Sequence, residues 1–444
     1  MILVLVLILC QTVYLYHANL DVFSLTASPL PLSTAPQKGP LIYNPSLKLD
    51  MVVKGLKFPT TMAFLGPDDI LVLEKDNGTV RRIVNGTLLP EPLLDVNVST
   101  QEERGMLGIA VLPKHGNRPT YVFLYYTESK TKDGDDINAS LANSRPLGNR
   151  LYRYELADNN TKLINPELLQ DLPAMQGPRH NGGKMIIGPD KNLYLVIGDV
   201  RNHATQARNE LSGPPPDGTG GILRITKDGK PAQGVKGKKT ILGDTYPLSL
   251  YYAYGIRNSF GIDFDPVTKK LWDTENGPTY GDEINRVKPG FNSGWNKVQG
   301  RWNVTQNETI RNIASHIVGL VNFNGTGKYS SPEFTWKPPV GVTAIKFIHS
   351  DKLGKQYQND MFVGDFHRGY LYHFDLNKNR TGLVLNGSLA DRIADSPEEF
   401  VNSSIIFGKG FGGITDIEVG PDGYLYIVSY GQGTIFRIKQ INDN

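Results

Sequence analysis

Two short phrases of apolar and polar residues alternate along most of this chain. The first phrase is an apolar run that usually ends in Pro-Asp or a variant of it, and it occurs at residues 62–68, 107–113, 185–190, 260–266, 344–349 and 417–422. The second phrase is a polar or glycine turn followed by alternating apolar residues, and it occurs at residues 78–83, 149–154, 221–225, 282–287, 369–374 and 433–438. The phrases alternate strictly, six times each, which indicates one structural unit repeated six times.

The alternation of apolar and polar positions inside each unit predicts strands. Further alternating runs, at residues 70–73, 193–197 and 425–428, lie between the two phrases, so one unit is an antiparallel meander of three or four strands. Because no long amphipathic helix interrupts the units, we predict an all-β fold, a six-bladed β-propeller with long inter-strand loops. A large β-sandwich or barrel is the alternative. The long loops are expected at residues 128–145, 202–220 and 301–328.

A propeller would bring residues that are distant in the sequence to one place. The first strand of each blade lines the central channel, so the residues that lead into these strands would meet at one mouth of the channel. They are Glu103-Arg104-Gly105, Arg179-His180-Asn181, Arg257-Asn258-Ser259, Gly341-Val342-Thr343 and Gly412-Gly413-Ile414-Thr415. We expect function at this mouth because concave sites with convergent polar groups are where ligands bind.

The composition excludes several classes of protein. The net charge of +3 over 444 residues, with basic and acidic residues interleaved, provides no footprint for nucleic acid. Cys10 is the single cysteine, which rules out a disulfide framework and a cysteine-based zinc site. The 47 glycines and 29 prolines favour many turns over long helices.

The N-terminal segment predicts export. Residues 1–20 are strongly apolar but short for a spanning helix, and we interpret them as a signal peptide or an N-terminal membrane anchor, with a buried strand as the alternative. Residues 21–46 are rich in Ser, Thr and Pro and are expected to form a flexible tether. The propeller domain is therefore expected to span residues 47–440.

A high density of N-glycosylation sequons agrees with an extracellular or cell-surface location. The acceptor residues are Asn77, Asn85, Asn97, Asn138, Asn159, Asn303, Asn307, Asn324, Asn379, Asn386 and Asn402. Such sequons carry glycans on exposed loops of exported proteins, and we predict a glycoprotein. The alternative is that Asn, Ser and Thr are simply common in the turns of a β fold.

Two residues at the predicted mouth have side chains suited to catalysis. His180 is a candidate general base, because the imidazole pKa lies near neutral pH, while its alternative role is that of a structural histidine in the channel. Arg257 could polarise a carbonyl or hold a carboxylate through charge-assisted hydrogen bonds, while the alternative is a bridge between blades.

The segment Trp272–Asn285 concentrates carboxylates and turn residues. Its Gly277-Pro278 turn, with Asp and Glu nearby, provides the oxygen ligands that calcium prefers. The spacing does not match an EF-hand loop, and an acidic loop without a metal is the alternative reading of this segment.

Three motifs in this order resemble the soluble quinoprotein glucose/sorbosone dehydrogenase family. They are His180-Asn181-Gly182-Gly183, Tyr254-Gly255-x-Arg257-Asn258 and Glu275-x-Gly277-Pro278-x-x-x-Asp282-Glu283-Ile284-Asn285, supported by Glu103-x-Gly105-Met106-Leu107-Gly108-Ile109-Ala110 and Trp336-x-Pro338. The resemblance covers roughly residues 47–438. The Gly-Pro and Asp-Glu-Ile-Asn cluster is its most specific part.

The resemblance implies a six-bladed propeller that holds pyrroloquinoline quinone and calcium at the channel mouth. It implies that His180 removes a hydroxyl proton from the substrate and that Arg257 polarises the quinone carbonyl. The cofactor-binding positions that it implies are Asn258, Gly277, Pro278, Trp336, Thr343, His367 and Arg368. The carbonyls of Gly277 and Pro278 would ligate calcium, and Glu283 would serve a second, structural calcium.

The chain departs from the family pattern at several positions near the expected cofactor. Arg179 stands where an aspartate precedes the histidine, His367 stands in the phrase that contains a cofactor-binding lysine, and Val200 replaces a glutamine. Gly413-Ile414-Thr415 stands where two arginines are expected. The changes at His367 and at Gly413-Ile414-Thr415 remove cationic contacts to a cofactor that carries three carboxylates.

We therefore expect an exported oxidoreductase that oxidises an aldose sugar or related alcohol by base-assisted hydride transfer to the quinone, with an unidentified electron acceptor. A non-catalytic cell-surface binding propeller, like the hedgehog-interacting proteins, is one alternative. A calcium-dependent lactonase-like hydrolase is another, but it would need several carboxylates inside the channel, where the residues leading into the first strands offer mainly Glu103.

Overall fold

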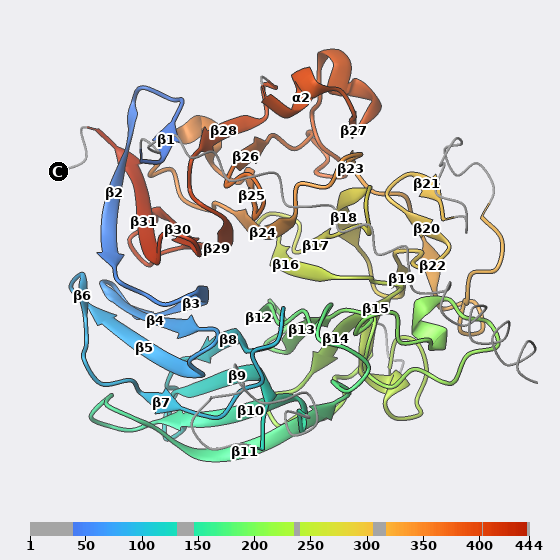
Figure 1. The fold of residues 1–444 in the computed structure, drawn as a ribbon, viewed down its shortest axis with the longest axis horizontal. Helices are drawn as coiled ribbons and strands as arrows, with labels where there is room; N and C mark the ends of the chain where they lie inside the picture. Colours follow the sequence, from blue (N-terminus) through green and yellow to red (C-terminus); the bar gives the residue numbers. More distant parts are fainter. Residues whose placement is uncertain (1–38, 131–145, 235–239, 305–316, 402, 442–444) are drawn as a thin grey trace, which may run out of the picture. The chain divides into compact units, whose positions relative to one another are not determined.

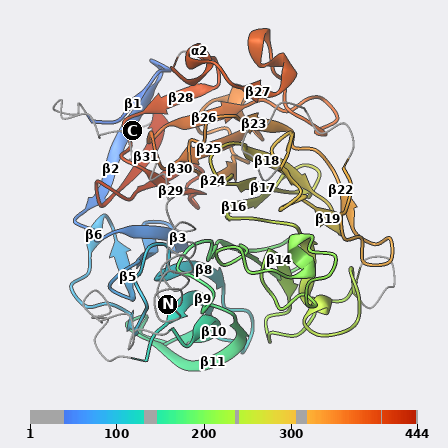
Figure 2. The same ribbon diagram turned by 45° about the vertical axis from the view of Figure 1, so that its right-hand side comes forward.

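The computed structural model describes residues 39–130, 146–234, 240–304, 317–401 and 403–441. Pro40–Asn444 forms one compact unit. Its secondary structure is almost wholly β, and its sheets can be followed by label in Figure 1 and from a second direction in Figure 2. The described residues form six sheets of four to six strands and one two-stranded sheet.

We number the six large sheets in chain order of their innermost strand. Sheet 1 contains β3 (Pro59–Gly66), β4 (Asp69–Glu74), β5 (Thr79–Val84), β6 (Thr87–Leu88) and β7 (Leu94–Asp95). Sheet 2 contains β8 (Met106–Leu112), β9 (Tyr121–Glu128), β10 (Gly148–Leu156) and β11 (Leu163–Leu172). Sheet 3 contains β12 (Met185–Ile187), β13 (Leu193–Ile197), β14 (Gly221–Ile225), β15 (Tyr251–Tyr254), β19 (Phe291–Asn292) and β22 (Lys328–Tyr329).

The second half of the chain forms the other three large sheets. Sheet 4 contains β16 (Ser259–Phe264), β17 (Leu271–Glu275), β18 (Asp282–Val287), β23 (Phe334–Trp336) and β27 (Ile393–Ala394). Sheet 5 contains β24 (Val342–Phe347), β25 (Met361–Asp365), β26 (Leu371–Phe374), β28 (Ile406–Lys409) and β1 (Leu41–Ile42). Sheet 6 contains β29 (Ile414–Val419), β30 (Leu425–Ser429), β31 (Thr434–Gln440) and β2 (Leu47–Lys54).

The remaining regular elements are short. The two-stranded sheet pairs β20 (Val298–Gln299) with β21 (Trp302–Asn303). The α-helix α2 spans Pro397–Val401. Single 3₁₀ turns occur at Gln206–Arg208, Leu248–Leu250, Lys355–Tyr357 and Gly387–Asp391. Among the described residues no helix is long and apolar enough to cross a membrane.

The innermost strands contact one another in a closed cycle, β3 to β8, β12, β16, β24, β29 and back to β3. Glycines allow the close approach: a Cβ on Gly108 would lie 1.9 Å from the Gly183 carbonyl oxygen, and one on Gly261 would lie 2.4 Å from the Thr343 carbonyl oxygen. The prediction of an all-β propeller is therefore confirmed. Apolar side chains fill the spaces between neighbouring sheets, as with Trp272 and Phe334 of sheet 4 and Phe347 of sheet 5.

Irregular pairing occurs near the beginning of most innermost strands. Register shifts interrupt the ladders at Pro59/Met62, Met106/Gly108, Ser259/Gly261, Val342/Ala344 and Ile414/Asp416. A bulge bends its strand and re-aims the side chains beside it. The residues that lead into the innermost strands are therefore turned relative to the regular ladder, which helps to gather them at one mouth.

The N-terminal boundary of the propeller lies earlier than the predicted Leu47. Leu41 and Ile42 pair with Lys409 and Gly408, so the end of the proposed tether already belongs to sheet 5. β2 then pairs with β31 and completes the sheet of the C-terminal strands. The proposed signal or anchor and the tether up to residue 38 lie outside the described residues, as do parts of the predicted long loops, and they stay predictions.

Candidate functional site

A cavity of about 510 Å³ opens at the mouth where the predicted residues were expected to meet. The predicted site residues that line it are His180, Arg257, Asn258, Gly277, Pro278, Thr343 and His367. Glu103, Arg179 and Thr415, which also lead into innermost strands or begin them, line the same cavity. Thr60 of β3 in sheet 1 lines it as well, so the cavity gathers residues of all six large sheets. Trp336, Arg368 and Glu283 are not among the lining residues.

His180 is held in an unusual backbone conformation at the wall of the cavity. Its φ of 62° lies in the left-handed region, and the following Gly182 and Gly183 also have positive φ. Asn181 anchors the segment, because its side chain donates to the Pro178 carbonyl at 2.8 Å and its own carbonyl accepts from the Tyr125 hydroxyl at 2.9 Å. The sequence His-Asn-Gly-Gly therefore forms a tight turn that presents the imidazole.

Asp199 orients the His180 ring. Its Oδ1 lies 2.5 Å from His180 Nδ1, and both side chains are buried. A carboxylate at this position favours a proton on Nδ1, which leaves Nε2 free to accept one. The arrangement makes His180 a base of fixed tautomer. Asp199 was not identified as a site residue from the sequence, although it lies two residues after β13, the strand paired with β12.

Hydrogen bonds keep Asp199 ionised. Burial raises its pKa, but the His180 contact, the backbone N–H of Asn202 at 3.0 Å and Trp295 Nε1 at 2.7 Å outweigh burial, so the pKa lies below its usual value. Arg208 Nε also donates to this carboxylate at 3.0 Å. Asp199 therefore places a negative charge next to the His180 ring.

Glu103 forms a second contact to the histidine segment. Its Oε2 accepts the backbone N–H of His180 at 2.6 Å, and both of its oxygens lie 3.3 Å from Asn258 Nδ2. Burial raises the pKa of Glu103, while the nearby charges of His180 and Arg257 act in the opposite direction. Glu103 therefore connects the base to Asn258 across the cavity wall.

Arg257 and Asn258 present polar atoms that lack partners. Arg257 Nη1 donates to the carbonyls of Asn276 at 2.9 Å and Gly277 at 3.0 Å, and its guanidinium lies 5.5 Å from the centre of the Trp295 ring. Burial lowers the pKa of Arg257. Within the described part of the chain, Arg257 Nε and Asn258 Oδ1 are buried without a hydrogen-bond partner. Such orphaned groups at the implied quinone contacts fit a polar cofactor.

The Gly277-Pro278 turn is organised by Asp282. This carboxylate accepts the backbone N–H of Gly277 at 2.8 Å, that of Val340 at 2.8 Å and that of Gly341 at 2.7 Å. Asp282 thus ties the turn of sheet 4 to the beginning of sheet 5. A Cβ on Gly277 would lie 1.8 Å from the Tyr280 carbonyl oxygen, so the turn requires glycine.

Glu283 lies in a separate cluster of buried carboxylates. Glu283 is paired with Glu275 in the β17–β18 ladder. Asp273 lies two residues before Glu275 on β17, so it is on the same face of the sheet, and all three side chains are buried. Burial is the first cause that raises the pKa of each of the three, and repulsion between them raises those of Glu275 and Glu283 further. Glu275 Oε2 and both Asp273 oxygens have no hydrogen-bond partner among the described residues.

Two predicted cofactor contacts lie elsewhere in the structure. Trp336 is 1% exposed and packs against Phe334, with ring centres 4.7 Å apart, and against Tyr372 at 5.2 Å. As a residue of the outer strand β23, it belongs to the core between sheets 4 and 5. Arg368 points instead to Phe400, with its guanidinium 4.8 Å from the ring centre. Neither placement supports the predicted contact with a cofactor in the cavity.

Most other cations of the cavity wall are already paired. Lys75 Nζ lies 2.6 Å from Asp76, and Arg179 forms an ion pair with Glu102 at the rim. Lys184 lines the cavity but contacts Asp416. The basic character of the wall is therefore largely balanced by carboxylates.

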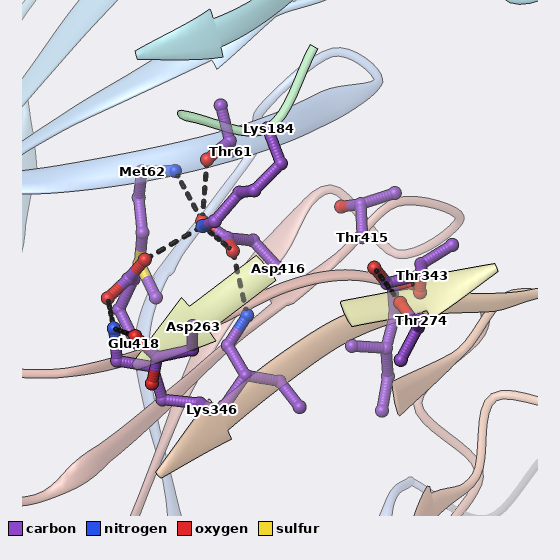
Figure 3. Close-up of polar contacts among 12 residues, drawn as sticks. Thr61, Met62, Lys184, Asp263, Thr274, Thr343, Lys346, Thr415, Asp416 and Glu418 are labelled. Atoms are coloured by element: carbon purple, nitrogen blue, oxygen red, sulfur yellow. Dashed lines mark hydrogen bonds and ion pairs between the residues drawn. The ribbon is translucent and has the colours of Figure 1, made fainter. Parts of the chain in front are cut away.

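An ion network lies among the innermost strands next to this cavity (Figure 3). Lys184 Nζ lies 2.5 Å from Asp416 and 2.7 Å from Glu418, and Lys346 Nζ lies 2.7 Å from Glu418 and 3.3 Å from Asp263. Burial raises the pKa of Glu418, but the two lysines lower it more, to about 2. The network was not predicted.

The network bears on the hydrolase alternative. Asp263, Asp416 and Glu418 place carboxylates between the innermost strands, where the sequence had suggested mainly Glu103. Their charges are, however, paired with Lys184 and Lys346. They are therefore poor ligands for a catalytic cation while these ion pairs persist.

Comparison with known proteins gives consistent matches. The family model described as Glucose / Sorbosone dehydrogenase matches residues 56–437. The chain is 25% identical to aldose sugar dehydrogenase YliI of Escherichia coli (strain K12) over 402 residues, which cover 89% of this chain and 94% of that protein. It is 27% identical to quinoprotein glucose dehydrogenase B of Acinetobacter calcoaceticus over 320 residues, which cover 67% of this chain and 61% of that protein.

Solved structures show the same fold. The PQQ-bound form of aldose sugar dehydrogenase from Streptomyces coelicolor aligns with a TM-score of 0.61 at 24% identity, over 91% of this chain and 99% of that one. The hedgehog-interacting protein of Mus musculus, by contrast, is 24% identical over 189 residues, only 40% of this chain.

Proposed function

Because the chain belongs to the glucose/sorbosone dehydrogenase family and is therefore an oxidoreductase, we propose that it oxidises an aldose sugar or related alcohol in the cavity at the channel mouth. One observation carries this proposal. The oriented pair of His180 and Asp199 lies in the same cavity wall as the orphaned polar atoms of Arg257 and Asn258.

The residues of this chain have distinct tasks in the proposed reaction. Pyrroloquinoline quinone, when bound, supplies the acceptor for the hydride that leaves the substrate carbon. His180 Nε2 takes the hydroxyl proton from that carbon's oxygen, and Asp199 stabilises the imidazolium that results. Arg257 would donate to the cofactor, and Asn258, whose Nδ2 already contacts Glu103, would accept a hydrogen bond through Oδ1. The side chains of Thr343 and His367 add further polar groups to the cavity wall.

We also propose two calcium sites. The first uses the carbonyls of Gly277 and Pro278, although the Gly277 carbonyl accepts a hydrogen bond from Arg257 in this structure. The second uses Glu283 together with Glu275 and Asp273. Its support is electrostatic, because three buried carboxylates with orphaned oxygens are costly to ionise unless a cation neutralises them.

The six large sheets, whose innermost strands form one closed cycle, support the inference of six blades.

We further propose that the protein is exported to the cell surface or beyond, through its apolar N-terminal segment, and that it is glycosylated. Sequon asparagines with exposed side chains are Asn77, Asn85, Asn159, Asn324, Asn379 and Asn386. Expression in a secretory host and digestion with an N-glycosidase would test this proposal, and an unchanged mass would refute glycosylation.

Reconstitution tests the catalytic proposal. The purified protein would be loaded with pyrroloquinoline quinone and calcium, and dye reduction would be followed across a panel of aldoses and simple alcohols. We expect cofactor binding at micromolar concentration and reduction of the dye with at least one aldose. Absence of quinone binding would refute the proposal and favour a non-catalytic binding propeller.

A further inference from the structure

A histidine and two aspartates meet on sheet 5, outside the lining of the cavity at the channel mouth. His373 Nε2 lies 3.0 Å from an oxygen of Asp360 and 3.7 Å from an oxygen of Asp375. The three side chains each offer one atom, and these atoms all lie within 4.8 Å of one another. None of the three residues lines the cavity. We call Asp360, His373 and Asp375 the sheet 5 triad.

The strand register of sheet 5 brings the two aspartates together. Phe362 on β25 pairs with His373 on β26 in an antiparallel ladder. Two residues further along each strand, the same register places Asp360 opposite Asp375, on the face that carries His373, because side chains alternate between the two faces of a sheet. Like charges in opposite positions on neighbouring strands are destabilising. The triad therefore concentrates negative charge at one corner of the sheet.

The backbone fixes the positions of the three residues. Asp360 directly precedes β25, and its N–H donates to the Tyr357 carbonyl at 3.1 Å. His373 lies within β26, and its N–H donates to the Ile405 carbonyl at 2.8 Å. Asp375 directly follows β26. The triad is therefore built on the ends of two paired strands and not on a loose loop.

Three aromatic rings surround the His373 imidazole. The ring centre of Tyr357 lies 5.1 Å from that of His373, with the two planes at 90°, and those of Phe362 and Phe407 lie at 5.1 Å and 5.9 Å. An apolar shell of this kind limits the movement of a ligand and the access of water to it. The Asp375 side chain, in contrast, is 60% exposed. An ion can therefore reach the triad from the side of Asp375.

The two aspartates of the triad have no lysine or arginine partner among the described residues, and His373 is the ion-pair partner of both. Arg380 approaches the preceding residue, where it donates to the Asn359 carbonyl at 2.5 Å, but it pairs with Asp265 at 2.8 Å. Even a protonated His373 would leave one negative charge in excess. A divalent cation bound to a neutral imidazole would balance both carboxylates.

The donor set fits a transition metal ion better than calcium. Zinc sites combine imidazole nitrogen with carboxylate oxygen, and each ligand atom lies about 2.0–2.2 Å from the ion. At a tetrahedral angle, two such atoms lie about 3.3–3.6 Å apart. The separations of 3.0 Å and 3.7 Å from His373 Nε2 lie on either side of this range. Calcium and magnesium prefer oxygen ligands alone.

We propose that the sheet 5 triad is a structural site for Zn²⁺ or a similar divalent transition metal ion, with water as the fourth ligand. The ion ties the beginning of β25 to the end of β26. The proposal is independent of the proposed sugar oxidation, because the triad lies outside the cavity lining. The alternative is a simple ion pair between His373 and Asp360, in which Asp375 has no part.

A zinc titration of the purified protein tests the proposal. The protein is first freed of metal with a chelator and then saturated with calcium, so that the two proposed calcium sites are filled. Calorimetry should show one zinc ion bound at micromolar concentration. At a free zinc concentration of about 100 times Kd, Tm should rise by about 3 °C for a chain of this size.

Asp375→Asn is the decisive variant, because this exposed side chain contributes little packing and asparagine has nearly the same size. We expect zinc affinity to fall about tenfold or more and the rise in Tm to shrink to about half or less. Without zinc, the variant should be at least as stable as the wild type, because the repulsion from Asp360 is removed. His373→Ala should abolish zinc binding.

His203→Ala is the matched control. His203 is paired with a single aspartate, Asp217, at 2.6 Å, and its loss should leave zinc binding unchanged. Wild-type zinc affinity in Asp375→Asn would overturn the proposal, also where His373→Ala does not fold. Binding that requires millimolar zinc, or that His203→Ala weakens as much as Asp375→Asn does, would overturn it as well. Diffraction at the zinc absorption edge should place the ion about 2.0–2.2 Å from His373 Nε2, and an ion bound elsewhere would refute the site.

Discussion

The two sides of the cavity mouth are built from different chemistry. On sheets 2 to 4, hydrogen bonds hold the polar side chains. Glu103 accepts the backbone N–H of His180, the His180 ring contacts Asp199, and Arg257 donates to the Asn276 carbonyl. On sheets 5, 6 and 1, the rings of Phe366, Tyr430 and Phe58 contact one another, and Phe366 and Phe58 are exposed. Hydrogen bonds therefore fix the orientation of the polar side, which the proposed proton transfer requires, whereas ring packing holds the apolar side.

Removing the base on the polar side should have the largest effect. His180→Ala is expected to lower kcat about a thousandfold, since a positioned general base contributes about 10²- to 10⁴-fold, and to leave quinone binding largely intact. Single-turnover dye reduction and a quinone titration would measure the two quantities.

His203→Ala is the matched control for this prediction. His203 is also paired with an aspartate, Asp217, with Nε2 and Oδ2 2.6 Å apart, but it lies outside the cavity lining. A similar loss of turnover in both variants would contradict the role of His180 as the base.

Breaking the ion network should cost about 3 kcal/mol of folding stability. Lys184→Met removes the charge that pairs with Asp416 and Glu418, and unpaired buried charges are costly. Chemical denaturation would measure the free energy of unfolding, with the exposed Lys114→Met as the control. Equal stability of the two variants would show that the network does not stabilise the fold.

Replacing the orienting carboxylate should have a smaller catalytic effect than removing the base. Asp199→Asn retains a hydrogen bond to His180 but removes the negative charge that stabilises the imidazolium. We expect a loss of about a hundredfold in kcat, at the lower end of the range for general-base catalysis. A wild-type kcat in this variant would exclude Asp199 as a positioning residue.

The same substitution predicts a change in acid stability. The pKa of Asp199 is lowered in the folded state, so its contribution to stability is present above about pH 3.9, the usual aspartate value, and is lost as the pH falls through the lower folded pKa. The stability gap between wild type and Asp199→Asn should therefore narrow below about pH 4. Denaturation curves from pH 6 to pH 2 would measure it, and a constant gap would contradict the assignment.

The smallest effect is expected on the aromatic side. Gly413→Ala introduces a Cβ at a φ of 87° beside the Phe366 ring, and we expect a loss of about 1 kcal/mol in stability. Gly39→Ala, where a Cβ meets no atom within 4 Å, is the control in a thermal unfolding experiment. A Gly413 variant as stable as this control would mean that the Phe366 ring can move aside.

The chain's alternating phrases determined most of the fold by themselves. Period-2 patterns are local, and each phrase coincides with the innermost or the third strand of one sheet, as residues 107–113 do with β8. Because a propeller gathers the beginnings of its innermost strands, the pattern also placed His180, Arg257 and the Gly277-Pro278 turn in one cavity.

Tertiary structure alone decided how these residues are partnered. Asp199 beside His180, Lys184 beside Asp416 and Phe58 beside Tyr430 are contacts that arise where neighbouring strands or sheets meet, and no local pattern reports them. The burial of Trp336 and the contact of Arg368 with Phe400 have the same origin, because side-chain direction depends on which sheets pack together. The repeat thus specified where the chain turns, whereas closure of the cycle decided which side chains meet.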